Sequence, residues 1–213
     1  MQNKPRTPRA STVAAVAGLA LAAIALLGPG AHADAVPGKP APEFSATDSN
    51  GKTQKLADLK GRTVVLEWTN DGCPYVRKHY GSGNMQALQK AAADKGVVWL
   101  TVISSAKGEQ GHVDGAGANK LTTDRKAVPA AVLLDPAGTI GRAYGAKTTP
   151  HMYVIDKDGR LVYNGAIDDK PSSNAGDIKG ARNYLTEALT AVAEGKPVAV
   201  ASTRAYGCSV KYQ

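Results

Sequence analysis

The chain has 213 residues and a formal net charge of +8 at pH 7. Its lysines and arginines are scattered, without the basic patch interleaved with aromatic side chains that is typical of nucleic-acid binding, so nucleic acid is not an expected partner. The chain has two cysteines, Cys73 and Cys208, and a single bridge is too little for a disulfide framework to hold the fold together.

The N-terminal segment has the pattern of a secretory signal. A basic head with Lys4, Arg6 and Arg9 precedes an apolar stretch at residues 13–27, and small residues follow up to Ala33. The apolar stretch is shorter than the ~20 residues of a membrane-spanning helix. We therefore expect cleavage near Ala33, export to the periplasm or the extracellular space, and no stable membrane anchor. A retained anchor is the competing interpretation.

The sequence then divides into three parts. Residues 1–33 are the expected signal peptide, residues 34–197 one domain, and residues 198–213 a C-terminal tail that carries Cys208. The middle part is long enough for one hydrophobic core and too short for two ordinary domains.

The domain is predicted to begin with two strands around a central β-α-β unit. Short alternating runs flank Asn50 and Gly51, which is the signal of a β-hairpin. Residues 64–68 are an apolar, β-branched run typical of a buried strand, and residues 97–104 are a second one. Helical spacing between these runs, with Asn84 as an expected N-cap, predicts that the two strands are parallel.

The rest of the domain continues with alternating helices and strands. A glycine-rich loop is expected at residues 105–118 because the segment is long and polar. After it we expect, in order, a helix at 119–127, a strand at 131–134, a helix at 139–144, a hairpin of strands at 151–155 and 160–163, and an amphipathic helix from 181 to 192. This order predicts an α/β fold with a mixed central sheet flanked by helices.

Cys73 is the main candidate for chemistry. It follows the strand at 64–68 and the turn at 70–72, and Pro74 suits the first position of a helix because its missing N–H costs nothing there. Cys73 would then cap the helix, where free amides and the helix dipole lower the pKa of a thiol. Cations at residues 77–79 would also favour the thiolate. We predict a nucleophilic Cys73, with an inert buried cysteine as the alternative.

These patterns resemble a known family. The residues that carry the resemblance are 37–44, 48–51, 56–59, 64–68, Cys73 with Pro74, 149–156 and 161–169. They look like thioredoxin-fold proteins of the peroxiredoxin-like group, which includes alkyl hydroperoxide reductase and thiol-specific antioxidant proteins. The resemblance covers residues 34–213 and implies a thioredoxin-like fold with an N-terminal β-hairpin extension.

The resemblance also implies a cis proline. In that fold the proline packs against the active cysteine and exposes a backbone edge to a substrate polypeptide or partner. Pro150, after Thr149, is the corresponding residue here.

Two departures from the family pattern limit the chemistry that carries over. Val76 stands where thioredoxins have the second cysteine of Cys-x-x-Cys, which resolves the mixed disulfide. Asn70 stands three residues before Cys73, where typical peroxiredoxins have a threonine, and Thr69 is one place off. Neither the dithiol motif nor the peroxide motif is therefore intact.

From Cys73 at a helix cap in this fold, together with the export expected from the N-terminal segment, we infer an exported thiol-dependent oxidoreductase, either a thiol peroxidase or a thiol-disulfide oxidoreductase. Cys73 is expected to attack a peroxide or a protein disulfide, Cys208 is the candidate resolving thiol, and an external thiol reductant would restore the pair. The residues expected to shape the site are Trp68, Thr69, Asn70, Pro74, Thr149 and Pro150. The alternative is a non-catalytic thioredoxin-fold binding domain with a structural disulfide between Cys73 and Cys208.

Two histidines raise the question of a metal site. Thioredoxin-fold copper chaperones use two cysteines and a histidine, whereas here Cys73 has only His79 or His151 as candidate co-ligands. One cysteine with one histidine is a poor site. We therefore expect no metal ion and no cofactor.

Overall fold

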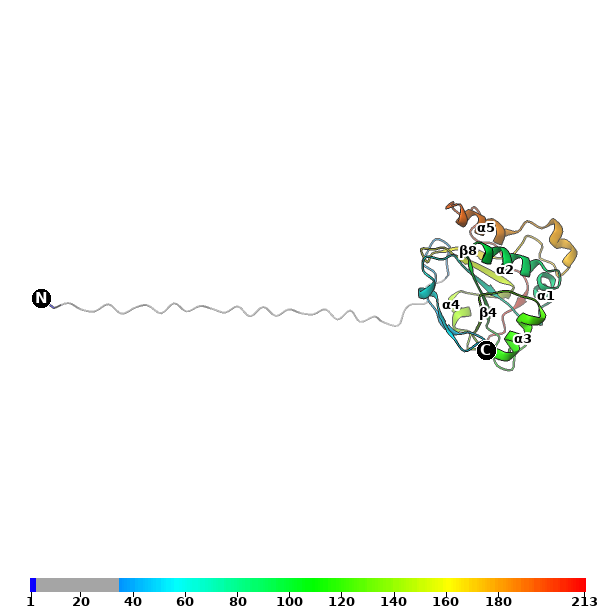
Figure 1. Cartoon of the computed structure of the whole chain (residues 1–213), viewed down its shortest axis with the longest axis horizontal. Helices are drawn as coiled ribbons and strands as arrows, with labels where there is room; N and C mark the ends of the chain where they lie inside the picture. Colours follow the sequence, from blue (N-terminus) through cyan, green and yellow to red (C-terminus); the bar gives the residue numbers. More distant parts are fainter. Residues whose placement is uncertain (3–34) are drawn as a thin grey trace. The chain divides into compact units, whose positions relative to one another are not determined.

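The computed structural model describes residues 1, 2 and 35–213 (Figure 1). Most of the expected signal peptide and its cleavage point near Ala33 lie outside the described residues. Within the described part, no helix has the length and apolar character needed to cross a membrane.

A five-stranded mixed sheet lies at the centre, in the order β5-β4-β3-β7-β8. The strands are β3 (Val64–Trp68), β4 (Val98–Ile103), β5 (Ala131–Leu134), β7 (His151–Ile155) and β8 (Leu161–Gly165). β3 is parallel to β4 and antiparallel to β7, and all its residues are buried. This central position explains why β3 is apolar at every position except Glu67. The parallel pair predicted from the sequence is confirmed.

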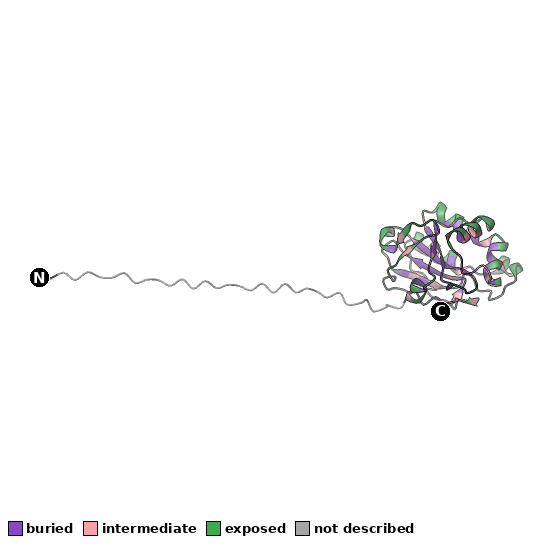
Figure 2. Ribbon diagram, turned by 90° about the horizontal axis from the view of Figure 1, so that it is seen from below, coloured by how far each residue is buried: buried purple, intermediate pink, exposed green. Residues whose placement is uncertain are grey.

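Helices cover both faces of this sheet, with α2 and α5 on one side and α4 on the other (Figure 1). Their bounds are α1 (Pro74–Gly81), α2 (Asn84–Asp94), α3 (Gly115–Asp124), α4 (Thr139–Ala143) and α5 (Tyr184–Ala193). Side chains alternate between the two faces along β3. Val65 therefore packs in the hydrophobic cluster with α1, α2 and α5, whereas Trp68 packs in the hydrophobic cluster with α4. Figure 2 shows the buried residues concentrated in the sheet and the exposed ones on the outer helices.

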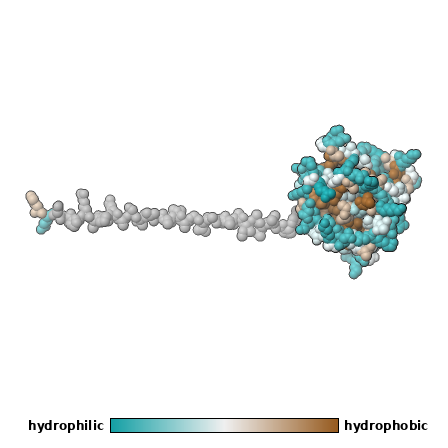
Figure 3. All heavy atoms as spheres, in the orientation of Figure 1, coloured by the Kyte–Doolittle hydropathy of each residue, from teal (hydrophilic) through white to brown (hydrophobic). Residues whose placement is uncertain are grey.

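A β-hairpin and a 3-10 helix precede the central sheet in the chain, and a second 3-10 helix follows it. β1 (Ser45–Thr47) and β2 (Thr53–Lys55) form the predicted antiparallel hairpin. The 3-10 helix η1 (Leu56–Leu59) leads into β3, and a second one, η2 (Ala175–Gly180), lies in the loop before α5. The surface in Figure 3 is mostly hydrophilic, and hydrophobic residues occupy small separate areas of it.

At α3 and α2 the predicted helix starts differ from the structure, and α5 likewise begins at Tyr184 rather than at 181. α3 begins at Gly115, inside the segment predicted as a loop, because the side chain of Asp114 caps it by accepting a hydrogen bond from Gly117 N at 2.7 Å. The N-cap of α2 is Gly83 rather than Asn84, whose Nδ2 lies 2.8 Å from Nδ1 of His79. Glycines and short polar side chains obscured the starts of α3 and α2.

The C-terminal tail forms a strand pair that was not predicted. β9 (Cys208–Ser209) pairs antiparallel with β6 (Thr148–Thr149), so that Cys208 lies opposite Thr149. Two residues per strand are too few for a periodic pattern, and the partner lies about 60 positions earlier in the chain. The tail therefore returns to the loop that contains Pro150.

Candidate functional site

Cys73 is placed by the turn between β3 and α1. It is the N-cap of α1, with Pro74 in the first turn, as predicted. The side chain of Asn70 shapes the turn, because its Oδ1 accepts a hydrogen bond from Gly72 N at 2.8 Å and its backbone carbonyl accepts one from Cys73 N at 3.1 Å. The Cys73 side chain is fully buried.

The loop before β7 supplies the contact to the sulfur. The peptide bond between Thr149 and Pro150 is cis, as the resemblance implied. The thiol of Cys73 donates a hydrogen bond to the carbonyl oxygen of Thr149 at 3.1 Å. The Thr149 hydroxyl is buried and has no hydrogen-bond partner among residues 35–213. The carbonyl thus accepts from the thiol, and the hydroxyl has a proton free to donate to a thiolate.

The tail brings the second thiol to this loop. Cys208 lies opposite Thr149, and both cysteines are free thiols in the structure. Gly207 allows the close approach, because a Cβ at this position would lie 2.0 Å from Thr149 O and 3.4 Å from Cδ of Pro150. Its φ of +140° also favours glycine. The structure therefore brings Cys73, Thr149 and Pro150 together, as the resemblance implied, and adds Cys208, whose position the sequence left open.

The two thiols have opposite pKa shifts. Burial acts to raise the pKa of Cys73, but hydrogen bonds from the Cys208 side chain and from the backbone of Val76 outweigh it, and the pKa falls below its ordinary value. The Thr149 side chain acts in the same direction. Burial and the neighbouring Cys73 raise the pKa of Cys208 to about 11. Cys73 is therefore the thiol that ionises first, and Cys208 keeps its proton.

The basic side chains that follow Cys73 on α1 have other partners. Arg77 donates to the backbone oxygen of Asp71 at 2.8 Å, and Lys78 lies 3.6 Å from a carboxylate oxygen of Asp168. Burial lowers the pKa of His79 to about 4, so this ring is neutral at physiological pH. Hydrogen bonds, rather than the expected cations, lower the pKa of Cys73.

The structure does not bring Trp68 to Cys73. Its indole lies in the hydrophobic cluster on the other face of the sheet, with ring centroids 5.0 Å from Tyr153, and its Nε1 donates to Ser104 at 3.0 Å. The reason is the alternation of side chains along β3, which ends with Trp68 facing α4. Trp68 supports the strand rather than lining the site of Cys73.

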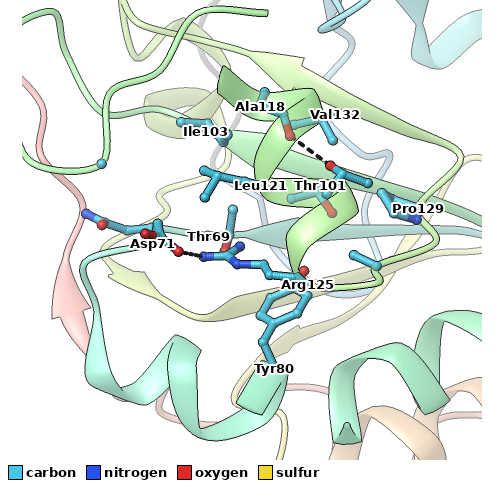
Figure 4. A pocket seen from close by; sticks show the side chains of 14 residues that line it. Thr69, Asp71, Tyr80, Thr101, Ile103, Ala118, Leu121, Arg125, Pro129 and Val132 are labelled. Carbon is cyan, nitrogen blue, oxygen red and sulfur yellow. Dashed lines mark hydrogen bonds and ion pairs between the residues drawn. The ribbon is translucent and has the colours of Figure 1, made fainter. Parts of the chain in front are cut away.

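Thr69 belongs to a small pocket on the α3 side of the turn (Figure 4). Arg125 crosses this pocket, with its guanidinium 2.6 Å from Asp71 and 4.4 Å from the ring centre of Tyr80. The Thr69 hydroxyl is buried and has no hydrogen-bond partner in the part of the chain that the structure describes. The residues that line this pocket include Thr69 and Asn70 but not Cys73.

Sequence reasoning missed Glu67, a fully buried carboxyl group in β3. It accepts hydrogen bonds from Tyr80 at 2.7 Å, from Trp99 at 2.8 Å and from Thr101 at 3.1 Å. Burial raises the pKa of Glu67 in spite of these donors. One glutamate inside an otherwise apolar strand is the signal that could have identified it.

Within residues 35–213, no group of three or more histidine, cysteine, aspartate or glutamate side chains is arranged to hold a metal ion. His151 instead lies 3.2 Å from the hydroxyl of Tyr153.

Comparisons with known proteins agree with this fold. The Redoxin family matches residues 36–185. Thiol-disulfide oxidoreductase ResA of Bacillus thuringiensis is 30% identical over 125 residues, which cover 59% of this chain and 66% of the relative. The chain thus spans slightly less than two thirds of the curated relatives that it matches.

Two solved structures are also similar. An uncharacterized conserved protein from Geobacillus kaustophilus has a TM-score of 0.72 and 26% identity, over 84% of this chain and 93% of its own. A putative thiol:disulfide interchange protein DsbE from Chlorobium tepidum has a TM-score of 0.50 and 27% identity, over 61% and 84%. The predicted thioredoxin-like fold is confirmed.

Proposed function

Because the chain belongs to the Redoxin family, we propose that it is a thiol-disulfide oxidoreductase whose reactive pair is Cys73 and Cys208. One observation carries the proposal: Cys208 lies opposite Thr149, whose carbonyl oxygen is 3.1 Å from the sulfur of Cys73. The opposite pKa shifts of the two thiols provide a nucleophile and a partner that keeps its proton until it is needed. The names of ResA and DsbE point to the same class of reaction.

The reaction is an exchange in two steps. The thiolate of Cys73 attacks one sulfur of a disulfide, whose S–S bond breaks, so that one sulfur leaves as a thiolate and the other stays bonded to Cys73. Cys208 then transfers its proton to the departing thiolate and attacks the sulfur of Cys73. The Cys73–Cys208 disulfide forms, the second sulfur is released as a thiolate, and two electrons have passed to the substrate. An external dithiol reduces the pair again.

Peroxide is the weaker candidate substrate. Asn70, at the position of the peroxiredoxin threonine, uses its side chain to hold the turn at Gly72. Arg125 is paired with Asp71 in the neighbouring pocket. The hydrogen bonds and charges that lower the pKa of Cys73 include no arginine among their main contributors. Among the described residues, these contacts therefore support a disulfide substrate better than a peroxide.

Export remains part of the proposal. Its support is the basic, apolar and small-residue pattern that ends near Ala33. An oxidising compartment is where a cysteine pair of this kind exchanges electrons with protein disulfides.

The experiment compares two oxidants on the reduced full chain. A protein disulfide and hydrogen peroxide are added in parallel, and mass spectrometry follows formation of the Cys73–Cys208 disulfide. We expect the protein disulfide to oxidise the pair, Cys208→Ser to trap a mixed disulfide on Cys73, and Cys73→Ser to be inert. Ser209→Ala, next to Cys208, is the matched control and should behave as wild type.

Two outcomes would overturn the proposal. Much faster oxidation by peroxide than by the protein disulfide would make the chain a thiol peroxidase. A bridge between Cys73 and Cys208 that resists dithiol reductants in the folded protein would support the non-catalytic binding domain.

A further inference from the structure

We propose that the C-terminal tail is an internal occupant of the partner-binding edge beside Pro150, and that Tyr206 is the positioning residue that holds it there. We call residues 206–212 the strap. The inference rests on the proposed function, because it concerns how a protein partner reaches Cys73. It assigns a role to Tyr206, Lys78 and Asp168, which the exchange reaction itself does not use.

The strap closes the site. Cys73 has no solvent-exposed surface, although it is the thiol that ionises first. The backbone edge of Thr148 and Thr149 is already paired with β9, and Gly207 lies against Thr149 O. An extended, cysteine-bearing segment of a protein partner would pair with this edge in the same way. Such a partner reaches the sulfur of Cys73 only after the strap has left.

A buried ion pair holds one end of the strap. The hydroxyl of Tyr206 donates a hydrogen bond to Oδ1 of Asp168, and Nζ of Lys78 lies 3.3 Å from the same hydroxyl. Lys78 and Asp168 are 3.6 Å apart, with side chains at most 2% exposed. Lys78 lies on α1. The contact of Tyr206 with Lys78 and Asp168 thus attaches the strap to α1, the helix that Cys73 caps. Tyr206 lies two residues before Cys208.

Tyr212 holds the other end. Its hydroxyl donates to the backbone oxygen of Ala146 at 2.8 Å, and the guanidinium of Arg142 lies 4.6 Å from its ring centre. Between the two tyrosines, β9 contributes two residue pairs to β6, and two more backbone hydrogen bonds join Val210 N to Lys147 O at 3.0 Å and Ala106 N to Lys211 O at 2.8 Å. So short a ladder is weak by itself. The side-chain anchors at the two ends therefore add to this backbone pairing in keeping the strap in place.

The test measures access to Cys73 without any turnover. In the Cys208→Ser full chain, the rate of alkylation by iodoacetamide is followed against pH. Adding Tyr206→Phe removes the hydroxyl bound to Asp168, and we expect the plateau rate to rise about ten-fold, the usual worth of a hydrogen bond to a charged group. Tyr184→Phe is the matched control, since Tyr184 makes a ring contact with Arg182 but no hydrogen bond through its hydroxyl among the described residues, and should leave the rate unchanged.

The pH profile separates access from acidity. A higher plateau shows that the strap has opened, and the midpoint should move to higher pH because the backbone of residue 208 no longer donates a hydrogen bond to Cys73. An unchanged plateau in Tyr206→Phe would overturn the proposal. An equal rise in Tyr184→Phe would overturn it as well, because the effect would then be general loosening. If the alkylation results are as expected but no disulfide exchange is found, the proposed function is contradicted. The proposal that the strap covers Cys73 then still holds.

A second variant tests occupancy of the edge directly. A chain that ends after Ala205 lacks the strap but keeps the Lys78–Asp168 pair, and we expect its Cys73 to be alkylated faster than in Tyr206→Phe. A synthetic peptide of residues 206–213 with serine in place of Cys208 should slow that reaction, and a scrambled peptide should not. Equal behaviour of the two peptides would show that the edge does not select the strap and would overturn the proposal.

Discussion

Thr149 acts on the nucleophile in two ways: its carbonyl oxygen accepts a hydrogen bond from the Cys73 thiol, and its side chain is among the groups that lower the pKa of Cys73. Thr149→Val keeps the carbonyl that accepts from the thiol and removes the hydroxyl that stabilises the thiolate. We expect the pKa of Cys73 to rise and its alkylation rate at pH 7 to fall about ten-fold. The comparison is Thr148→Val, because the Thr148 hydroxyl also lacks a partner within residues 35–213 but is not a main contributor to the pKa of Cys73. Equal rates in the two variants would assign the effect to packing.

The single residue Glu67 makes the free energy of unfolding depend on pH. Its pKa is raised in the folded protein, so the unfolded chain loses this proton first as pH rises. Folding stability therefore falls with rising pH above the ordinary pKa of a glutamate, about 4.5, until the folded carboxyl also ionises. Urea unfolding at pH 5 and pH 8 should show wild type losing stability relative to Glu67→Gln. Parallel changes in the two proteins would contradict this assignment.

At the scale of elements, the β6–β9 pair depends on the absence of a side chain at Gly207. Gly207→Ala would place a Cβ 2.0 Å from Thr149 O, so the two strands must separate. We expect slower formation of the Cys73–Cys208 disulfide after addition of a disulfide oxidant. Gly159→Ala is the matched control, because Gly159 also has a positive φ but nothing lies within 4 Å of its added Cβ. If both variants form the disulfide at the wild-type rate, contact with Thr149 is not limiting.

Elements also show where sequence reasoning succeeds. β3, the two hairpins and the cysteine cap were predicted because apolar periodicity, turn residues and Pro74 act over a few positions. β9 and the start of α3 were not predicted, because one depends on a distant strand and the other on a cap in a glycine-rich segment. Trp68 was expected to shape the site of Cys73, but its side chain lies on the opposite face of the sheet. A strand pattern indicates that side chains alternate between the two faces, but it does not say which face of the sheet lies next to Cys73.

At the scale of the whole molecule, oxidation should change global stability. A bond between Cys73 and Cys208 would close most of the described chain into one loop, which reduces the entropy of the unfolded state. By that argument the oxidised protein should be more stable than the reduced one by up to about 5 kcal/mol. Urea unfolding of both forms measures the difference, and the double variant Cys73→Ser with Cys208→Ser should show none. A less stable oxidised form would mean that the bond forces the strap out of its anchored position.

The sequence by itself determined a mixed α/β sheet and the placement of one cysteine at a helix start after a buried strand, and the family resemblance narrowed this to a thioredoxin-like fold. The elements and the cysteine cap follow from local rules, since strand, turn and cap residues act on their immediate neighbours. Only the tertiary structure decided that Cys208 lies opposite Thr149, that Glu67 is buried beneath donors, and that Tyr206 is bound to an ion pair. These contacts join segments far apart in the chain, and their existence depends on strand register and packing, which no local pattern specifies.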